Sequence, residues 1–189
     1  MRIDKSLNLV CHAESENGDI HFHSMPILRD TFKKYSLVLC KTFNELLQNG
    51  LIVMGARIAA NHLEEVAVSL NRWEGKEGVK DGLMKEIERL TNVLVLTEKG
   101  WEALPVDLAL SRDYVSEEDW EEAKQKIVFF TLIYVMATLE ARREFFDGMN
   151  STWGTETTSA DCMEYIRSLP TLTATEITSR TENQSSVPV

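Results

Sequence analysis

The chain has 189 residues, of which 43% are hydrophobic and 26% are charged, which is the composition of an ordinary globular protein. That length favours a single domain that can bury a core without disulfides or metal ions. The 30 acidic residues against 20 basic ones give a net charge of -10, which disfavours nucleic-acid binding because phosphates attract Lys and Arg.

The three cysteines, Cys11, Cys40 and Cys162, lie far apart and form no CxxC pair, so we expect reduced thiols rather than a disulfide framework. The first five residues already contain charged side chains and lack an apolar core of secretory length. We therefore expect a protein that stays in the cytoplasm of the cell that makes it.

The N-terminal segment is predicted to be a β-hairpin. An extended apolar stretch runs up to Val10, Asn17-Gly18 is a typical turn pair, and residues 20–23 alternate between apolar and polar. Apolar residues then recur at steps of three and four, which predicts a helix over 27–48. A second helix, over 56–70, has an Ala-rich face that favours close helix packing.

The middle of the chain is less regular. Three glycines among charged residues predict a loop over 73–82, and a short helix follows around 83–90. Residues 93–104 fit either a second small hairpin or an irregular packed loop, and their periodicity does not decide between the two. Pro105 begins a short predicted helix over 106–111.

The longest predicted helix begins after Ser116, whose hydroxyl can cap it, and continues through Phe145 to a stop at Gly148 and Asn150. Between Ile127 and Leu139 it is apolar on every face. This run has 13 residues, whereas a membrane span needs about 20. We therefore predict a helix buried in a protein interior or against a second chain.

Beyond this helix the composition becomes polar, which predicts a linker over 151–159, a short helix over 160–168 and a disordered tail rich in Ser and Thr. The predicted fold class is mainly α: an N-terminal β-hairpin, a multi-helix bundle with one long buried helix, and a disordered C-terminal tail. The predicted division is a helical domain over 1–150, a linker and short helix over 151–170, and a tail over 171–189.

No catalytic or cofactor-binding motif is present, so we expect no enzyme activity, no cofactor and no metal site. His21 and His23 lie two apart and face the same way on a strand, and His12 could lie across the hairpin from them. No further residues have ligand spacing, so we expect a solvated strand face. A metal protein or enzyme that uses these three histidines is one alternative.

A second alternative comes from the span 98–122, which holds nine acidic residues against Lys99 and Arg112. Acids at a helix start usually cap the helix and face solvent. They also permit an acidic inhibitor that mimics nucleic acid or occupies a basic groove of a host protein.

Short sequence motifs in a fixed order complete the pattern. They are HSMPI at 23–27 leading into Phe32–Tyr35, EIERLTNV at 86–93, GWEALP at 100–105, IVFFT at 127–131 and SLPT at 168–171. With these motifs the chain resembles the tail assembly chaperones of long-tailed bacteriophages, which are encoded just ahead of the tape-measure protein.

The resemblance implies a non-enzymatic helical protein that binds the tape-measure protein and helps recruit tail-tube subunits. It implies work in the host cytoplasm, absence from the mature virion and, in many members, a longer frameshifted product that shares this N-terminal part. We expect no membrane or nucleic-acid partner, and self-association is left open. The partner-binding residues expected from the apolar helix faces are Ala56, Ala59, Leu63, Phe129, Leu132 and Met136.

Overall fold

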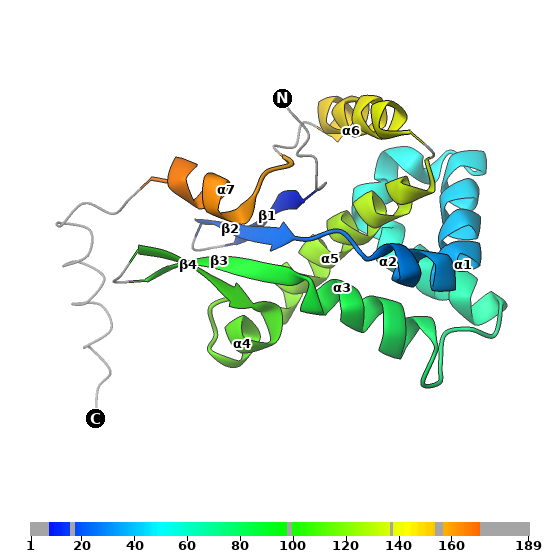
Figure 1. Ribbon diagram of the computed structural model, residues 1–189, viewed down its shortest axis with the longest axis horizontal. Helices are drawn as coiled ribbons and strands as arrows, with labels where there is room; N and C mark the ends of the chain where they lie inside the picture. Colours follow the sequence, from blue (N-terminus) through cyan, green and yellow to red (C-terminus); the bar gives the residue numbers. More distant parts are fainter. Residues whose placement is uncertain (1–7, 16–17, 98–99, 137, 154–156, 171–189) are drawn as a thin grey trace.

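A computed structural model describes residues 8–15, 18–97, 100–136, 138–153 and 157–170 (Figure 1). The protein is mainly helical, with one antiparallel sheet whose strand order is β1-β2-β3-β4. The strands are β1 (Leu9–Ser15), β2 (Gly18–Ser24), β3 (Thr91–Thr97) and β4 (Gly100–Pro105). The helices are α1 (Arg29–Gln48), α2 (Gly55–Ser69), α3 (Lys85–Arg89), α4 (Val106–Ser111), α5 (Glu117–Leu132), α6 (Leu139–Trp153) and α7 (Cys162–Ser168).

The predicted N-terminal hairpin is confirmed, and its two turn residues, 16 and 17, lie outside the described residues. The alternative left open for 93–104 resolves as a second hairpin, β3–β4. Strand β3 pairs with β2, for example His21 with Leu94, so the two hairpins form one sheet. The fold is therefore more than an N-terminal hairpin followed by helices, because a segment some 70 residues away completes the sheet.

The two faces of the first hairpin meet different helices. Alternation along β1 and β2 places Cys11 and Phe22 on one face, where Phe22 packs against Trp120 of α5 at a ring-centroid distance of 6.0 Å. The opposite face carries His12 and His21, which meet Tyr165 of α7. Figure 1 shows α7 beside this hairpin and α5 running past the sheet toward α1 and α2.

Helix α5 begins as the sequence predicts. The backbone N–H of Asp119 donates to Ser116 Oγ at 3.1 Å, and the backbone N–H of Ser116 donates to an Asp119 carboxylate oxygen at 3.0 Å. This reciprocal pair is a capping box, which satisfies N–H groups that the first turn of a helix leaves unpaired. The middle and end of α5 are buried against α2 and the hairpin.

The predicted long helix is wrong beyond Leu132. Helix α5 ends there, a short 3-10 turn (η3, Ile133–Val135) follows, and Met136 is extended with φ -70° and ψ 130°. The chain restarts as α6, where the hydroxyl of Thr138 accepts the N–H of Ala141 at 3.2 Å. The physical reason is packing: the turn brings Phe146 back onto Phe130, with ring centroids 4.6 Å apart.

The predicted stop at Gly148 and Asn150 is also wrong, because α6 continues to Trp153. The Asn150 amide instead donates to the Thr157 carbonyl at 2.7 Å. Thr158 then exchanges two backbone hydrogen bonds with Val10 of β1, at 2.7 and 2.9 Å. Part of the predicted polar linker is thus packed along the edge of the sheet.

The remaining predictions fall on three short segments. The predicted loop over 73–82 is shorter than expected, since a π-helical turn (η2) spans Val79–Met84 before α3. Helix α4 is confirmed at the predicted bounds. The tail over 171–189 lies outside the described residues, and the division into 1–150, 151–170 and 171–189 stays a prediction.

Candidate functional site

The six residues predicted to bind a partner lie mostly inside the protein. Ala56, Ala59, Leu63, Phe129 and Leu132 are at most 7% exposed, and Met136 is half-buried against the core. Helices α2 and α5 pack against each other, and a Cβ on Gly55 of α2 would overlap the Phe129 ring of α5. A partner could reach these five residues only if the two helices separated.

Exposed apolar side chains gather instead where α1 turns into α2. Leu47, Val53 and Met54 are 43%, 51% and 52% exposed, and they lie within eight consecutive residues. The turn forms because Gly50 adopts φ +66°, a conformation that favours glycine, and a 3-10 turn (η1, Leu51–Met54) follows. We call Leu47, Val53 and Met54 the apolar corner.

The corner has a structural origin that the periodicity of the sequence did not show. Within η1, Leu51 and Ile52 pack against the core, so the remaining two apolar side chains of the turn face outward. Leu37 of α1 and Val68 of α2 are also more than half exposed. Five of the nine large apolar side chains exposed in the described part of the chain therefore belong to α1, η1 and α2.

The three histidines considered from the sequence do not form one group. His12 and His21 lie opposite each other on β1 and β2, and their Nδ1 atoms are 2.9 Å apart. His23 is paired in register with Val10 and is 3% exposed. The expectation of a solvated strand face is wrong for all three, because His23 is buried and His12 and His21 are half-buried and contact Tyr165.

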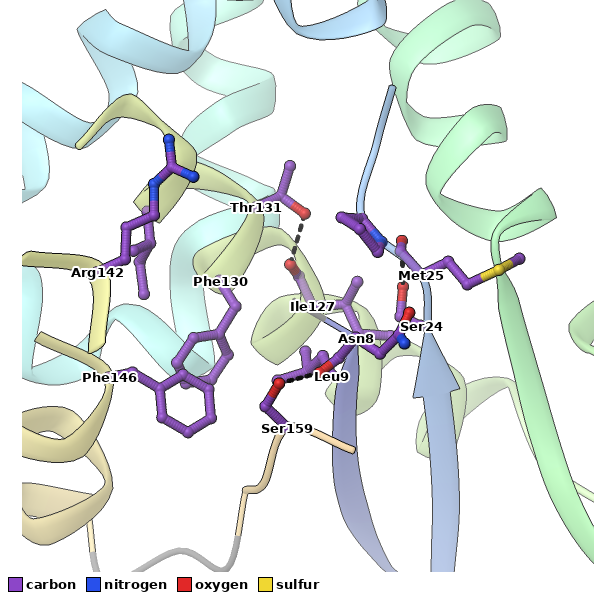
Figure 2. Close-up of a pocket in the computed structure, with 12 residues that line it drawn as sticks. Asn8, Leu9, Ser24, Met25, Ile127, Phe130, Thr131, Arg142, Phe146 and Ser159 are labelled. Atoms are coloured by element: carbon purple, nitrogen blue, oxygen red, sulfur yellow. Dashed lines mark hydrogen bonds between the residues drawn. The ribbon is translucent and has the colours of Figure 1, made fainter. Parts of the chain in front are cut away.

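A small apolar pocket lies where the hairpin meets α5 and α6 (Figure 2). Its volume is about 50 Å³, which has room for a few water molecules at most. Figure 2 shows Phe130 and Phe146 side by side at one wall, while the Arg142 guanidinium points away from Asn8 and Ser24. The Arg142 Nε donates to the Met136 carbonyl at 2.8 Å, so this cation supports the turn before α6.

A larger, polar cavity of about 380 Å³ lies between α1 and the loop before η2. It carries charges of both signs, and Lys34 pairs with Glu77 at 3.6 Å across it. The Tyr35 hydroxyl donates toward the carbonyls of Glu77 and Gly78 at 3.3 Å, which holds this loop against α1. The contacts of Lys34 and Tyr35 thus anchor the loop at this cavity.

The acidic span is partly neutralised by its own neighbours. Lys124 pairs with Glu121, and Lys126 pairs with Glu122 at 2.6 Å. Asp119 is engaged in the capping box of α5. The exposed acids that remain, such as Glu117 and Glu118, sit at the positive end of the helix dipole, where carboxylates are stabilising.

The cysteine thiols have ordinary structural surroundings. Burial raises the pKa of Cys11 to about 12, and it also raises the pKa of Cys162, with Asp161 adding to the effect. A nucleophilic cysteine needs a lowered pKa, so neither thiol has the environment of a nucleophile. Within the described residues, no three His, Cys, Asp or Glu side chains form a group that could hold a metal ion.

Comparison with known proteins yields no match to a family model, to a curated protein or to a solved structure. Among the helices described here, none is both long and apolar enough to cross a membrane.

Proposed function

We propose that this protein is a non-enzymatic tail assembly chaperone of a long-tailed bacteriophage. It binds the tape-measure protein and helps recruit tail-tube subunits during tail assembly. Two things support the proposal: the order of sequence motifs from HSMPI at 23–27 to SLPT at 168–171, and the apolar corner on the helical side of the fold.

The apolar corner is the structural observation that supports the proposal. Large apolar side chains exposed close together cost free energy in water and are typical of sites that bind another protein. An amphipathic client helix can cover Leu47, Val53 and Met54 with its own apolar face. A tape-measure protein is long and aggregation-prone, and such a chaperone shields its apolar stripes until tube subunits arrive.

The client-binding residues in this proposal differ from those expected from the sequence. Residues such as Leu63 and Phe129 are 0% exposed, so they support the shape of the helical layer rather than a contact. The exposed side chains where α1 turns into α2, such as Leu47 and Met54, take the role of contact residues. The protein acts in the host cytoplasm and is absent from the finished virion.

Co-expression with the tape-measure protein encoded beside this chain's gene tests the proposal. The chaperone should keep the client soluble and co-purify with it, and the complex should persist when salt is raised from about 0.1 M to about 0.5 M, because apolar contacts are not screened. Loss of the complex at the higher salt would favour the acidic inhibitor instead.

A matched variant separates the two mechanisms within that experiment. Glu117→Gln with Glu118→Gln removes two exposed acids at the start of α5 and leaves the capping box in place. The chaperone predicts unchanged recovery of the client with this variant. A large loss of client with it would contradict binding through the apolar corner.

A further inference from the structure

The cross-strand pair His12–His21 lies where a sheet brings side chains closest together. The backbone N–H and C=O of Val10 point away from β2, toward Thr158, and His12 is two residues further along the same edge. His12 and His21 are therefore a non-hydrogen-bonded pair, in which opposite side chains approach most closely. Strand geometry alone holds the two imidazoles side by side.

Helix α7 adds a third polar side chain to this pair. Tyr165 Oη is 3.3 Å from Nε2 of His12 and 3.4 Å from Nδ1 of His21. The Trp101 ring of β4 packs edge-on to His21, with ring centroids 5.6 Å apart. The Trp101 indole N–H donates to the Pro170 carbonyl at 2.9 Å, which fixes the chain just after α7 to the same sheet face.

The separations around His21 Nδ1 match those between ligands of a transition metal. Bonds of about 2.0–2.1 Å at angles of 90–109° place neighbouring ligand atoms about 2.9–3.4 Å apart. His21 Nδ1 lies 2.9 Å from His12 Nδ1 and 3.4 Å from Tyr165 Oη, whereas the 3.3 Å separation joins Tyr165 Oη to the other ring nitrogen of His12. His12 directs Nδ1 to His21 and Nε2 to Tyr165. Its ring must therefore rotate to bring one nitrogen toward a point that His21 Nδ1 and Tyr165 Oη also face.

We propose that His12, His21 and Tyr165 bind a divalent first-row transition metal ion, with Zn²⁺ as the type case. Imidazole nitrogen is a good ligand for such ions, and the Tyr165 oxygen supplies the third contact as a phenolate, whose proton is released to water when the ion binds. The remaining positions are taken by water, because both imidazoles are only half-buried. The ion ties α7 to the hairpin, and this role is separate from client binding at the apolar corner.

The surroundings of the pair suit a bound cation. The nearby cation Lys126 donates to the His12 carbonyl at 2.5 Å and is paired with Glu122, so its charge is balanced. Sequence spacing could not identify this set, because Tyr165 lies 144 residues beyond His21. It instead suggested His23, which pairs with Val10 further along the hairpin.

The test is a titration of Zn²⁺ into full-length protein that has been stripped with a chelator. We expect one ion per chain and, at about 100 times the dissociation constant, a rise in Tm of about 5–10 °C. His12→Ala and His21→Ala should each weaken binding by about 10–100-fold or more. Tyr165→Phe, which keeps the ring and removes only the oxygen, should weaken binding about tenfold and leave the metal-free Tm within about 1 °C.

His62→Ala is the control, because His62 lies on α2, away from the hairpin, and has Glu45 and Glu65 carboxylate oxygens at 3.3 Å that could also attract a metal ion. It should bind Zn²⁺ like the wild type. The proposal is overturned if binding is absent, if it persists in both hairpin variants, or if it is lost in His62→Ala. Full affinity in Tyr165→Phe would overturn the three-ligand assignment.

Discussion

Among the residues that the structure describes, Cys11 has a strongly altered ionisation. It is fully buried between the hairpin and α5, and desolvation raises its pKa to about 12, which outweighs the opposing effect of Lys126. Between the unfolded and folded pKa values the thiol is ionised in the unfolded chain and still protonated in the folded protein. Unfolding then releases a proton, so a rise in pH lowers the free energy of unfolding. The stabilisation is therefore complete below pH 9 and is lost as the pH rises toward 12.

The alkaline stability of the protein should reflect this residue. Between pH 8 and pH 10 the free energy of unfolding of the wild type should fall by about 1.4 kcal/mol more than that of Cys11→Ala, since only the wild type releases this proton on unfolding. Chemical denaturation at the two pH values measures the difference. Equal pH dependence in the two proteins would contradict the burial of Cys11.

Two glycines in helices should respond in opposite ways to alanine. Gly55→Ala places a Cβ into the Phe129 ring, and we expect it to destabilise the protein by about 1–3 kcal/mol. Gly148→Ala adds a methyl group within α6 with nothing within 4 Å, and it should stabilise by about 0.5–1 kcal/mol. Urea denaturation of both variants measures the two changes, and a stable Gly55→Ala would refute the packing of α2 on α5.

At the scale of secondary-structure elements, the break between α5 and α6 decides the shape of the helical layer. Phe145 stacks on Phe129 at 6.0 Å and meets Phe43 of α1 at 5.8 Å, while Phe146 packs on Phe130. These contacts exist only because the chain turns at Met136. Aromatic pairs of this kind contribute beyond the area that they bury.

Phe146→Ala should therefore destabilise the protein by about 3–5 kcal/mol, because it removes a buried ring that holds α6 to α5. Glu144→Ala, an exposed change two residues earlier in the same helix, should have an effect within about 0.5 kcal/mol. Thermal and chemical unfolding measure both. A mild effect of Phe146→Ala would indicate that α6 is not packed as described.

Caps and turn residues in the sequence predicted those element boundaries that are set by residues close to them in the chain. The capping pair Ser116 and Asp119, the turn at Gly50 and the start of α4 after Pro105 could all be identified from the sequence. The end of α5 could not, because no Gly or Pro marks it and the apolar run continues without interruption. The available signal was Thr138, which caps α6, but the turn itself depends on the aromatic contacts that follow.

For the whole molecule, the two ends of the described chain meet at the sheet. Thr158 pairs with Val10, and the Ser159 hydroxyl donates to the Asn8 carbonyl at 2.6 Å. These contacts pair the backbone at the start of the edge strand β1, which would otherwise be open there to pairing with another chain. They are long-range contacts, so the composition of the polar segment predicted only a linker.

Thr158→Pro tests this edge. Proline removes the N–H that donates to the Val10 carbonyl, so we expect weaker pairing, faster amide exchange at Val10 and its neighbours, and more aggregation at high protein concentration. Hydrogen exchange followed by mass spectrometry measures the first effect. Unchanged exchange along β1 would show that the segment 157–159 does not protect the strand in solution.

The candidate sites were predictable only in part. The hairpin and the possibility that His12 lies across it could be predicted from the sequence, but the register that sets His12 against His21 and the approach of Tyr165 come from the fold. The apolar corner was missed because periodicity identifies apolar faces and does not separate a buried face from an exposed turn. Burial of Leu63 and exposure of Met54 are set by how α1, α2 and α5 pack together.

Binding of the client at the apolar corner is measured by the amount of tape-measure protein retained on a tagged chain in about 0.5 M salt. Val53→Ser with Met54→Ser should reduce retention about tenfold, since the two changes together remove apolar contacts worth about 1.4 kcal/mol. Met163 is 57% exposed on α7, away from the corner, and the Met163→Ser variant should retain the wild-type amount of client. Equal retention by the corner variant and the wild type would contradict the account.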